Sequence, residues 1–365
     1  NIEDAYDTMA GAHYFCCMDM ASGYYQVPMA PEDKPKTAFC TRDGLYQFKV
    51  MPFGLCNAPA TFERMMESVL RGLLWEKCLV YIDDIICFGR TFEETLANLE
   101  LVFARLSGAN LSLKAKKCFL FKRELLYLGF VISGQGVKCD PSKLDSLREW
   151  EEPTNVSELR AFLGFVNYHR RFLPKLADVA EPLTCLLKKN TIWRWGERQL
   201  ESFEALREIL LNSKMLSHPI KDGRFILDTD ASAYGMGGAL SQVQGGVELP
   251  IAFASKTFSH TERKYCTTKR ELLAMVRMIS RFKHYLWGRP FTLRTDHAAF
   301  KWLLSFKDLS GVMGRWIMKL QEYDFEVVHR SGAQHQNADG LSRCKTCERS
   351  ECPGVPGKTT PAVEL

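Results

Sequence analysis

Four residues, Tyr81-Ile82-Asp83-Asp84, decide how the rest of this chain is interpreted. Apolar residues flank them on both sides, Cys78-Leu79-Val80 before and Ile85-Ile86 after. Such a run predicts a strand, a tight turn and a second strand, with the two acids at the turn. Because an unpaired buried charge is costly, the adjacent carboxylates indicate a divalent cation such as Mg²⁺, which prefers carboxylate and phosphate oxygens. The alternative is a surface hairpin with an acidic tip.

A third acid and two further motifs accompany these residues. Asp19 ends another strand-like run, and Ser22-Gly23-Tyr24-Tyr25-Gln26 follows it. Further on stands Met51-Pro52-Phe53-Gly54-Leu55-Cys56-Asn57-Ala58-Pro59. The order and spacing of these motifs and of Tyr81-Ile82-Asp83-Asp84 resemble the palm of a reverse transcriptase from gypsy-type LTR retrotransposons. The resemblance extends to about residue 343 and implies a piece of a Pol polyprotein.

Composition limits the class of protein. The chain has 365 residues, enough for two or three domains, and its 46% hydrophobic and 25% charged residues are usual for a soluble globular protein. The net charge is only +5, so a nucleic-acid site has to come from local basic clusters. Cysteines without regular spacing favour reduced thiols inside the cell. No apolar run approaches the roughly 20 residues of a membrane span, so no membrane partner is expected.

The resemblance implies an α+β chain with a right-hand polymerase architecture. We expect a reverse transcriptase palm with partial fingers over residues 1–133 and a mainly helical thumb and connection over 134–216. An RNase H-like α/β domain is expected over 217–343, and a linker or disordered tail over 344–365. The chain begins without Met and inside an apparent helix, so we expect an N-terminally truncated piece that lacks most of the fingers.

Local patterns predict individual elements. Helical stretches are expected over residues 60–75, 92–107 and 269–285. Another helix is expected after Asn155, because Glu158 three residues later completes a capping-box pattern. Residues 126–133 predict a strand, and residues 134–136 predict a turn.

Asp19, Asp83 and Asp84 are the candidate catalytic and metal-binding residues of the first site. Nucleotidyl transfer uses two divalent ions roughly 4 Å apart, which activate the primer 3′-hydroxyl and stabilise the leaving pyrophosphate. Carboxylates on adjacent strands can hold such a pair. The resemblance implies that Asp19 and Asp83 are the main ligands and that Asp84 assists. The expected cofactor is Mg²⁺, with Mn²⁺ as the alternative and two ions per active site.

Other residues match substrate-binding positions of the family. The resemblance implies that Tyr24 excludes a ribose 2′-hydroxyl; the alternative is a core aromatic. It also implies that Phe53 and Gly54 form the loop under the nascent base pair, where glycine allows a close backbone approach. Lys117 would meet phosphate or pyrophosphate, although a lysine run is often only a solvated surface. Leu128-Gly129 resemble the primer grip, a tight turn that holds the terminal phosphate of the primer.

The helix expected after Asn155 carries a further candidate surface. Arg160, Gly164 and Tyr168 are spaced four residues apart and therefore share one helix face. They resemble the thumb helix that lies in the minor groove of the template–primer, where contacts depend on duplex shape and not on sequence. The alternative is a solvent-facing stripe with a glycine that aids packing.

A second set of acids follows in the C-terminal part of the chain. Asp230, Glu271, Asp296 and Asp339 match, one by one, the four metal-binding acids of an RNase H domain. In that chemistry one ion activates a water and the other stabilises the departing 3′-oxygen. Asp228 lies two residues before Asp230 on the same strand face, so it could be mistaken for the first ligand.

Two features near the C-terminus stay open. His329 lies near a place where retroviral RNases H carry a histidine, and an ordinary surface histidine is the alternative. Cys344, Cys347 and Cys352 form C-x2-C-x4-C, but zinc usually takes four ligands and no fourth is evident. We therefore interpret this segment as a linker.

The predicted function is RNA-directed DNA polymerase with a fused RNase H. The expected partners are an RNA template, a DNA primer, RNA–DNA hybrid and dNTPs, together with the protease and integrase of the parent polyprotein. The expected location is the cytoplasm, in a virus-like particle, with access to the nucleus. The alternative is a domesticated or truncated relic that binds RNA–DNA duplex or retains only nuclease activity.

Overall fold

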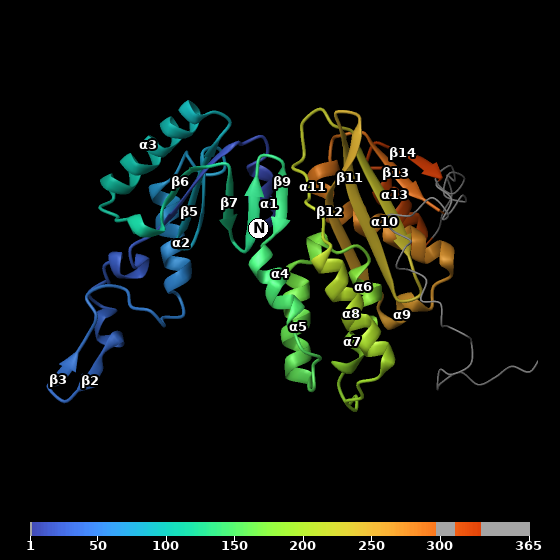
Figure 1. Ribbon diagram of the computed structural model, residues 1–365, viewed down its shortest axis with the longest axis horizontal. Helices are drawn as coiled ribbons and strands as arrows, with labels where there is room; N and C mark the ends of the chain where they lie inside the picture. The colour runs from blue at the N-terminus through green and yellow to red at the C-terminus, as the bar shows by residue number, and fades with distance from the viewer. Residues whose placement is uncertain (1, 297–310, 330–365) are drawn as a thin grey trace, which may run out of the picture.

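The computed structural model of the chain describes residues 2–296 and 311–329. A four-stranded sheet and a five-stranded sheet form the centres of two bodies, and a group of short helices lies between them (Figure 1). The mixture of helices and sheets confirms the α+β class. Within the described residues, no helix combines the length and apolar character that crossing a membrane requires.

The first sheet is antiparallel and has the strand order β4-β5-β1-β6. Its strands are β1 (Tyr14–Asp19), β4 (Cys78–Tyr81), β5 (Asp84–Gly89) and β6 (Phe119–Lys122). Two helices pack on it, α2 (Ala58–Val69) and α3 (Phe92–Gly108), and bury Phe62, Met66 and Val102 against the strands. The predicted helix 92–107 is confirmed. The prediction of helix up to residue 75 is wrong, because Gly72 and Trp75 take positive φ and turn the chain.

Short elements surround the edge of this sheet. They are α1 (Ile2–Thr8), the 3-10 helices η1 (Gly23–Gln26), η2 (Lys34–Thr37) and η3 (Ala115–Lys117), and the hairpin β2 (Phe39–Thr41) and β3 (Gly44–Tyr46). The hairpin extends away from the rest of the chain (Figure 1). All its residues are exposed.

A three-stranded antiparallel sheet follows, made of β7 (Glu124–Tyr127), β8 (Phe130–Ser133) and β9 (Gly136–Cys139). The prediction of one strand over residues 126–133 is wrong. Leu128 and Gly129 have φ of 46° and 73°, which reverses the chain and makes a hairpin. The predicted turn at 134–136 joins β8 to β9. This sheet packs on α1 through a shared core that includes Tyr6, Phe130 and Ile132.

The next segment is helical, as predicted. It contains α4 (Pro141–Arg148), α5 (Val156–Tyr168), η4 (Arg170–Phe172), α6 (Leu176–Val179), α7 (Glu181–Leu186) and α8 (Glu197–Leu211). Asn155 caps α5, because its side chain accepts hydrogen bonds from the Ser157 and Glu158 amides. Leu159, Phe162, Phe203 and Leu206 are buried in the core of this segment.

The five-stranded sheet has the order β12-β11-β10-β13-β14. Its elements are β10 (Phe225–Ala231), β11 (Gly235–Gln244), β12 (Val247–Thr257), α9 (His260–Arg263), α10 (Thr267–Arg281), α11 (Lys283–Leu286), β13 (Phe291–Thr295), α13 (Gly311–Leu320) and β14 (Phe325–His329). The predicted helix 269–285 is broken at Phe282, between α10 and α11.

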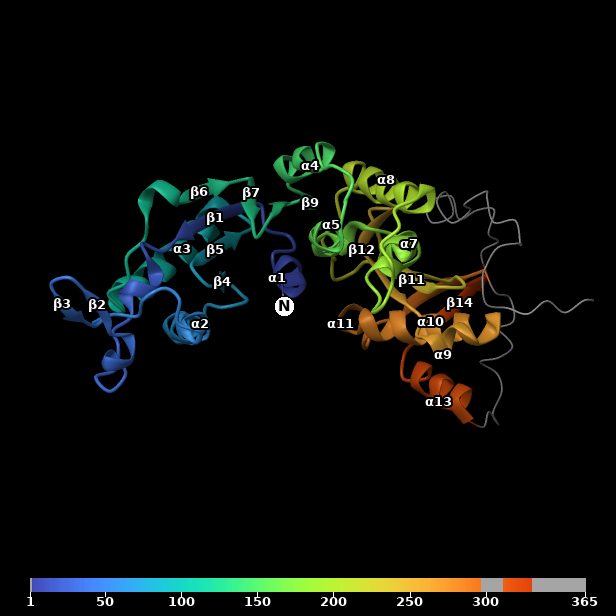
Figure 2. The same cartoon turned by 90° about the horizontal axis from the view of Figure 1, so that it is seen from below.

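The two faces of this sheet have different neighbours (Figure 2). A Cβ atom at Gly238 would meet Met278 of α10, whereas Cβ atoms at Gly235 and Gly237 would meet the segment that contains Lys175 and Asp178. Since neighbouring strand residues point to opposite faces, α10 covers one face and the helical segment touches the other.

A buried polar network joins the three parts of the chain. The Arg171 guanidinium of η4 donates to Asp7 Oδ1 of α1 at 2.8 Å. The Tyr285 hydroxyl of α11 donates to the other Asp7 carboxylate oxygen and accepts from Arg171 at 3.2 Å. Because buried charges are tolerated only when they are paired, this network favours one arrangement of the parts.

Candidate active sites

The first site is formed where β1 and β4 end and β5 begins. In the antiparallel register of β1 and β5, Asp19 lies directly opposite Asp84. Asp83 occupies the turn between β4 and β5, next to Ile82, which takes a positive φ of 53°. The Asp83 carbonyl accepts a hydrogen bond from the Met20 amide at 3.1 Å and so ties the turn to the end of β1. The structure thus brings the three predicted acids together.

The electrostatics of this cluster match a site for a cation. Burial, followed by the charges of Asp19 and Asp84, raises the pKa of Asp83. Burial and the Asp19 charge also raise the pKa of Asp84. Asp83 Oδ1 is buried and lacks a hydrogen-bond partner within the described residues. An all-carboxylate set with a free buried oxygen fits a hard divalent ion, although no preformed shell of three ligands exists in the described part of the chain.

Lys117, predicted to meet phosphate or pyrophosphate, lies beside this cluster. Its ammonium donates to Asp19 Oδ2 at 2.8 Å, and this hydrogen bond raises the pKa of Lys117. The Lys114 amide donates to the Asp19 carbonyl at 2.8 Å and holds the lysine segment beside β1. The Lys117 side chain is 56% exposed, so it is accessible to a ligand from solvent.

Tyr24 lies between the core and the surface. Its ring contacts Phe62 of α2 at 5.5 Å and Phe53 at 5.1 Å between centroids. Phe53 is 56% exposed and also contacts Tyr25. Gly54 takes a φ of +93°, which favours glycine at this place in the loop. Tyr24 therefore has one side in the core, as in the core interpretation, and one side toward the exposed aromatic, as a substrate gate needs.

Gly23 is a functional candidate that sequence reasoning missed. A Cβ atom there would lie 2.4 Å from Asp83 Oδ1 and 2.8 Å from the Phe62 ring. Only a residue without a side chain leaves room for the Asp83 carboxylate. The one available signal was its place between Asp19 and Tyr24 in the first motif.

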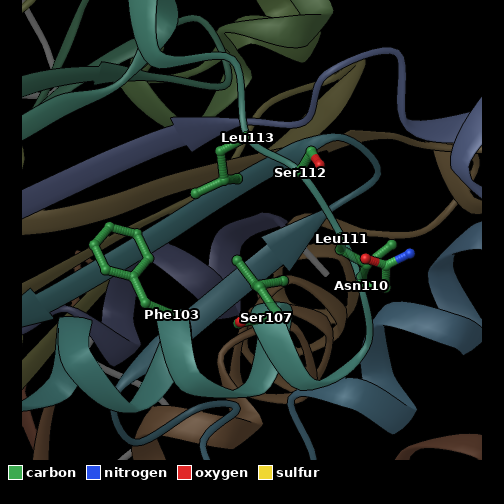
Figure 3. A pocket seen from close by; sticks show the side chains of 7 residues that line it. Phe103, Ser107, Asn110, Leu111, Ser112 and Leu113 are labelled. Atoms are coloured by element: carbon green, nitrogen blue, oxygen red, sulfur yellow. The ribbon is translucent and has the colours of Figure 1, made fainter.

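A hollow of about 340 Å³ lies at the C-terminal end of α3 (Figure 3). Phe103, Ser107, Leu111 and Leu113 are among its lining residues, and none of the lining residues is an acid. The Ser112 backbone, which also lines it, exchanges hydrogen bonds with the Gln26 side chain at 2.7 and 2.9 Å. One lining residue of the hollow therefore holds the motif that follows Asp19, and the carboxylates do not line the hollow.

The predicted primer grip and thumb face meet at one point. Arg160 and Gly164 are exposed, and a Cβ atom at Gly164 would meet nothing within 4 Å, so this face of α5 is open. Tyr168, at the end of the same face, donates its hydroxyl to the Leu128 carbonyl at 2.6 Å. A Cβ atom at Gly129 would lie 3.1 Å from that hydroxyl. The structure therefore places Tyr168 on the Leu128-Gly129 turn.

The second site lies at the ends of β10 and β13. Asp230 is near the end of β10, Asp296 directly follows β13, and Glu271 reaches them from α10. The Ala231 amide donates to Glu271 Oε1 at 3.2 Å, while Oε2 is buried and has no partner within the described residues. Burial, then the charges of Asp230 and Asp296, raise the pKa of Glu271 to about 8. This donor set also fits a divalent cation.

A lysine from the segment after α5 contacts this site, and the sequence did not predict this contact. The Lys175 ammonium lies 2.6 Å from Asp230 Oδ2, and its side chain is only 10% exposed. Nearby, Asp178 Oδ1 accepts a hydrogen bond from the Ser232 hydroxyl at 2.5 Å. A Cβ atom at Gly237 would come within 3.7 Å of Lys175, so small residues on β11 leave room for this segment.

The remaining candidates are placed as follows. Asp228 shares the strand face of Asp230 but lies 3.8 Å from Arg294, which supports the view that it is an ion-pair partner. The His329 ring donates to the Asp296 carbonyl at 2.9 Å. Asp339 and the cysteines at 344, 347 and 352 lie outside the described residues.

Two regions of the chain match family models of known proteins. A family model described as reverse transcriptase (RNA-dependent DNA polymerase) matches residues 2–132. A second, described as an RNase H-like domain found in reverse transcriptase, matches residues 221–323.

Relatives of known sequence match across both regions. The retrovirus-related Pol polyprotein from transposon 297 of Drosophila melanogaster is 40% identical over 346 residues, covering 94% of this chain and 32% of the relative. The Pol polyprotein from transposon gypsy of the same organism is 34% identical over 345 residues, covering 91% of this chain and 33% of the relative. The chain thus spans about a third of the length of these curated relatives.

Solved structures show the same fold. A foamy viral protease-reverse transcriptase in complex with double-stranded DNA aligns with a TM-score of 0.76 and 23% identity, over 90% of this chain and 59% of that chain. The foamy viral protein in complex with RNA/DNA hybrid aligns with a TM-score of 0.74 and 22% identity, over 98% of this chain and 48% of that chain.

The fold and the two acidic sites define a polymerase palm joined to an RNase H-like domain, which is the class of the reverse transcriptases. Within that class, the chain is similar to a region of the Pol polyproteins of gypsy and other LTR transposons.

Proposed function

We propose that this chain copies RNA into DNA and cleaves the RNA strand of the resulting hybrid. The observation that carries the proposal is the convergence of Asp19, Asp83 and Asp84 at one sheet edge, in a chain with a second acidic cluster at Asp230, Glu271 and Asp296. When bound, two Mg²⁺ ions per site, or Mn²⁺ in their place, would activate the attacking oxygen and stabilise the leaving one.

The residues of the chain have separate tasks in this proposal. In the palm, the free buried oxygen of Asp83 and the facing carboxylates of Asp19 and Asp84 would hold the ions. Lys117, already beside Asp19, would neutralise phosphate oxygens of the incoming dNTP or the leaving pyrophosphate. In the nuclease site, Asp230, Glu271 and Asp296 would be joined by Asp339 of the matching motif.

Nucleic-acid contacts are proposed for the surfaces around the palm. Tyr24 would lie against the sugar of the incoming nucleotide and exclude a ribose, while Phe53 and Gly54 would support the new base pair. Arg160 and Gly164 of α5 would follow the duplex groove. The foamy viral structures contain double-stranded DNA and RNA/DNA hybrid, which are the substrate classes we propose here.

The proposed domains retain the expected boundaries. They are the palm with partial fingers over 1–133, the thumb and connection over 134–216, the RNase H-like domain over 217–343 and a linker over 344–365. We propose that in the parent polyprotein a protease and an integrase accompany them, within a cytoplasmic virus-like particle.

Two assays on the purified chain test the proposal. The first extends a labelled DNA primer on an RNA template with dNTPs and Mg²⁺, and the second follows a labelled RNA strand in an RNA–DNA hybrid. We expect extension and cleavage, both lost with EDTA, and no cleavage of an RNA duplex. Cleavage without extension would instead favour a nuclease-only relic, and hybrid binding without either reaction would favour a domesticated binding protein.

A further inference from the structure

The turn between β7 and β8 has an unfavourable backbone. Tyr127 pairs with Phe130, so Leu128 and Gly129 alone form the turn. Both have positive φ, 46° and 73°, as a two-residue type I′ turn requires. Glycine adopts this conformation freely, but leucine pays roughly 1–2 kcal/mol for it. A conformation of this kind persists only where its surroundings hold it.

Two tyrosine hydroxyls hold this turn by one carbonyl group. Tyr168 of α5 donates to the Leu128 carbonyl at 2.6 Å, and Tyr6 of α1 donates to the same oxygen at 3.2 Å. The Tyr168 ring also stacks on Phe130, with centroids 5.2 Å apart and planes at 16°. Gly129 completes the contact, since a Cβ atom there would lie 3.1 Å from the Tyr168 hydroxyl.

These contacts connect the β7–β8 turn to helix α5, two parts of the chain that are separated in sequence. The turn belongs to the β7–β9 hairpins, whereas Tyr168 ends the open α5 face that carries Arg160 and Gly164 (Figure 1). Any movement of α5 against the hairpins has to break or carry the bond to Leu128. The hydroxyl of Tyr168 is directed at protein, and the residue as a whole is still 48% exposed.

We propose that Tyr168 is a positioning residue for the primer terminus: it holds the strained Leu128-Gly129 turn in place from the thumb helix. The proposal rests on the proposed function, in which this turn is the primer grip. It differs from a direct contact of Tyr168 with the duplex, because the effect passes through the Leu128 backbone. The position of α5 on a template–primer is thereby transmitted to the turn that holds the primer end.

The Tyr168→Phe variant removes the hydroxyl and keeps the ring. A lost hydrogen bond of about 1 kcal/mol corresponds to a roughly fivefold weaker affinity for template–primer, measured by fluorescence anisotropy. The KM for dNTP, and the rate of hybrid cleavage at saturating hybrid, should stay at the wild-type level. Tyr6→Phe, which removes the longer bond to the same oxygen, should act in the same direction with a smaller effect.

A second substitution separates positioning from direct contact. Leu128→Gly relieves the backbone strain, so Tyr168→Phe combined with Leu128→Gly should recover affinity to within about twofold of wild type. If Tyr168 instead contacts the duplex directly, the double variant remains as weak as Tyr168→Phe. That result, or a Tyr168→Phe variant with wild-type affinity, would overturn the proposal.

Hydrogen exchange tests the contact without any polymerase activity. Amide exchange in residues 124–133 should become faster in Tyr168→Phe and return toward the wild-type rate when Leu128→Gly is added. Unchanged exchange in Tyr168→Phe would overturn the positioning role. If the wild-type chain fails to extend a primer while the variants show this exchange pattern, the result would count against the proposed function alone.

Discussion

The proposed polymerase and nuclease sites are both built from carboxylates with a lysine beside them, and the two lysines differ in exposure. Each joins carboxylates from strand ends, and in each a lysine contacts one aspartate, Lys117 with Asp19 at 2.8 Å and Lys175 with Asp230 at 2.6 Å. The Lys117 side chain is 56% exposed, whereas that of Lys175 is 10% exposed. A solvent-exposed lysine forms a weak ion pair that salt screens, whereas a lysine that is largely shielded from solvent is more costly to separate from its partner.

This difference indicates two ways in which an acidic cluster is neutralised. In the palm, Lys117 can exchange its ion pair with Asp19 for one with a phosphate from solvent, with little change elsewhere in the protein. At the nuclease site, the lysine comes from the helical segment beside α6, which packs on β11 and β12, so its departure requires that segment to shift. We therefore expect a ligand to displace the lysine from its aspartate more easily in the palm than at the nuclease site.

The largest effect is expected for Glu271→Gln, which tests how buried the nuclease site is. The Glu271 pKa is raised from 4.5 to about 8, so the folded protein binds a proton that the unfolded chain releases. This stabilisation is complete below pH 4.5 and is lost as the pH rises through 8. In EDTA at pH 8 the variant should be more stable than wild type by roughly 4 kcal/mol, with little difference at pH 4.5.

Denaturant unfolding at several pH values measures this effect, and hybrid cleavage should be lost in the variant. An Asp83→Asn variant is the control for the other site. Equal stability of Glu271→Gln and wild type at pH 8 would show that the nuclease site is no more buried than the palm.

The next effect is expected for Gly23→Ala, which tests how tightly the palm site is packed. The added Cβ would come within 2.4 Å of Asp83 Oδ1 and has no room to move away from Phe62. Primer extension should fall by about a hundredfold, while hybrid cleavage stays unchanged. Gly108→Ala is the matched control, because a Cβ atom there meets nothing within 4 Å. Full extension by Gly23→Ala would mean that the carboxylate can relocate freely.

The smallest effect compares the two lysines directly. Lys175→Met should raise the apparent affinity of the nuclease site for Mn²⁺ by about tenfold, because a buried competing cation is removed. Lys117→Met should change Mn²⁺ affinity in the palm by less than about threefold, because the pair there is exposed. Mn²⁺ titration followed by electron paramagnetic resonance gives both values. Equal changes in Mn²⁺ affinity in the two variants would contradict the view that the two lysines are held differently.

The sequence predicted the acids better than their neighbours. Asp19, Asp83, Asp84 and Glu271 were singled out because each lies in a local motif on a strand end or helix, and the structure brings each set together. The partners Lys175 and Gly23 could not be assigned, since neither lies in a pattern that indicates which distant segment it will contact.

The errors in secondary structure have a similar cause. Residues 126–133 form an apolar run typical of one strand, but the positive φ of Leu128 depends on hydroxyls from α1 and α5. Likewise, the spacing of apolar residues favoured a helix up to residue 75. In the structure α2 ends at Val69, and Gly72 and Trp75 take positive φ, which a helix cannot contain. Periodicity predicts the buried face of an element and does not include contacts made by remote parts of the chain.

The most direct test of two independent sites in one chain is a reciprocal pair of variants. Asp83→Asn should lower primer extension on an RNA template by at least about a thousandfold and leave hybrid cleavage within about twofold of wild type. Asp296→Asn should lower cleavage to the same extent and leave extension intact. Extension by Asp83→Asn at the wild-type rate, or loss of both activities in either variant, would contradict the account.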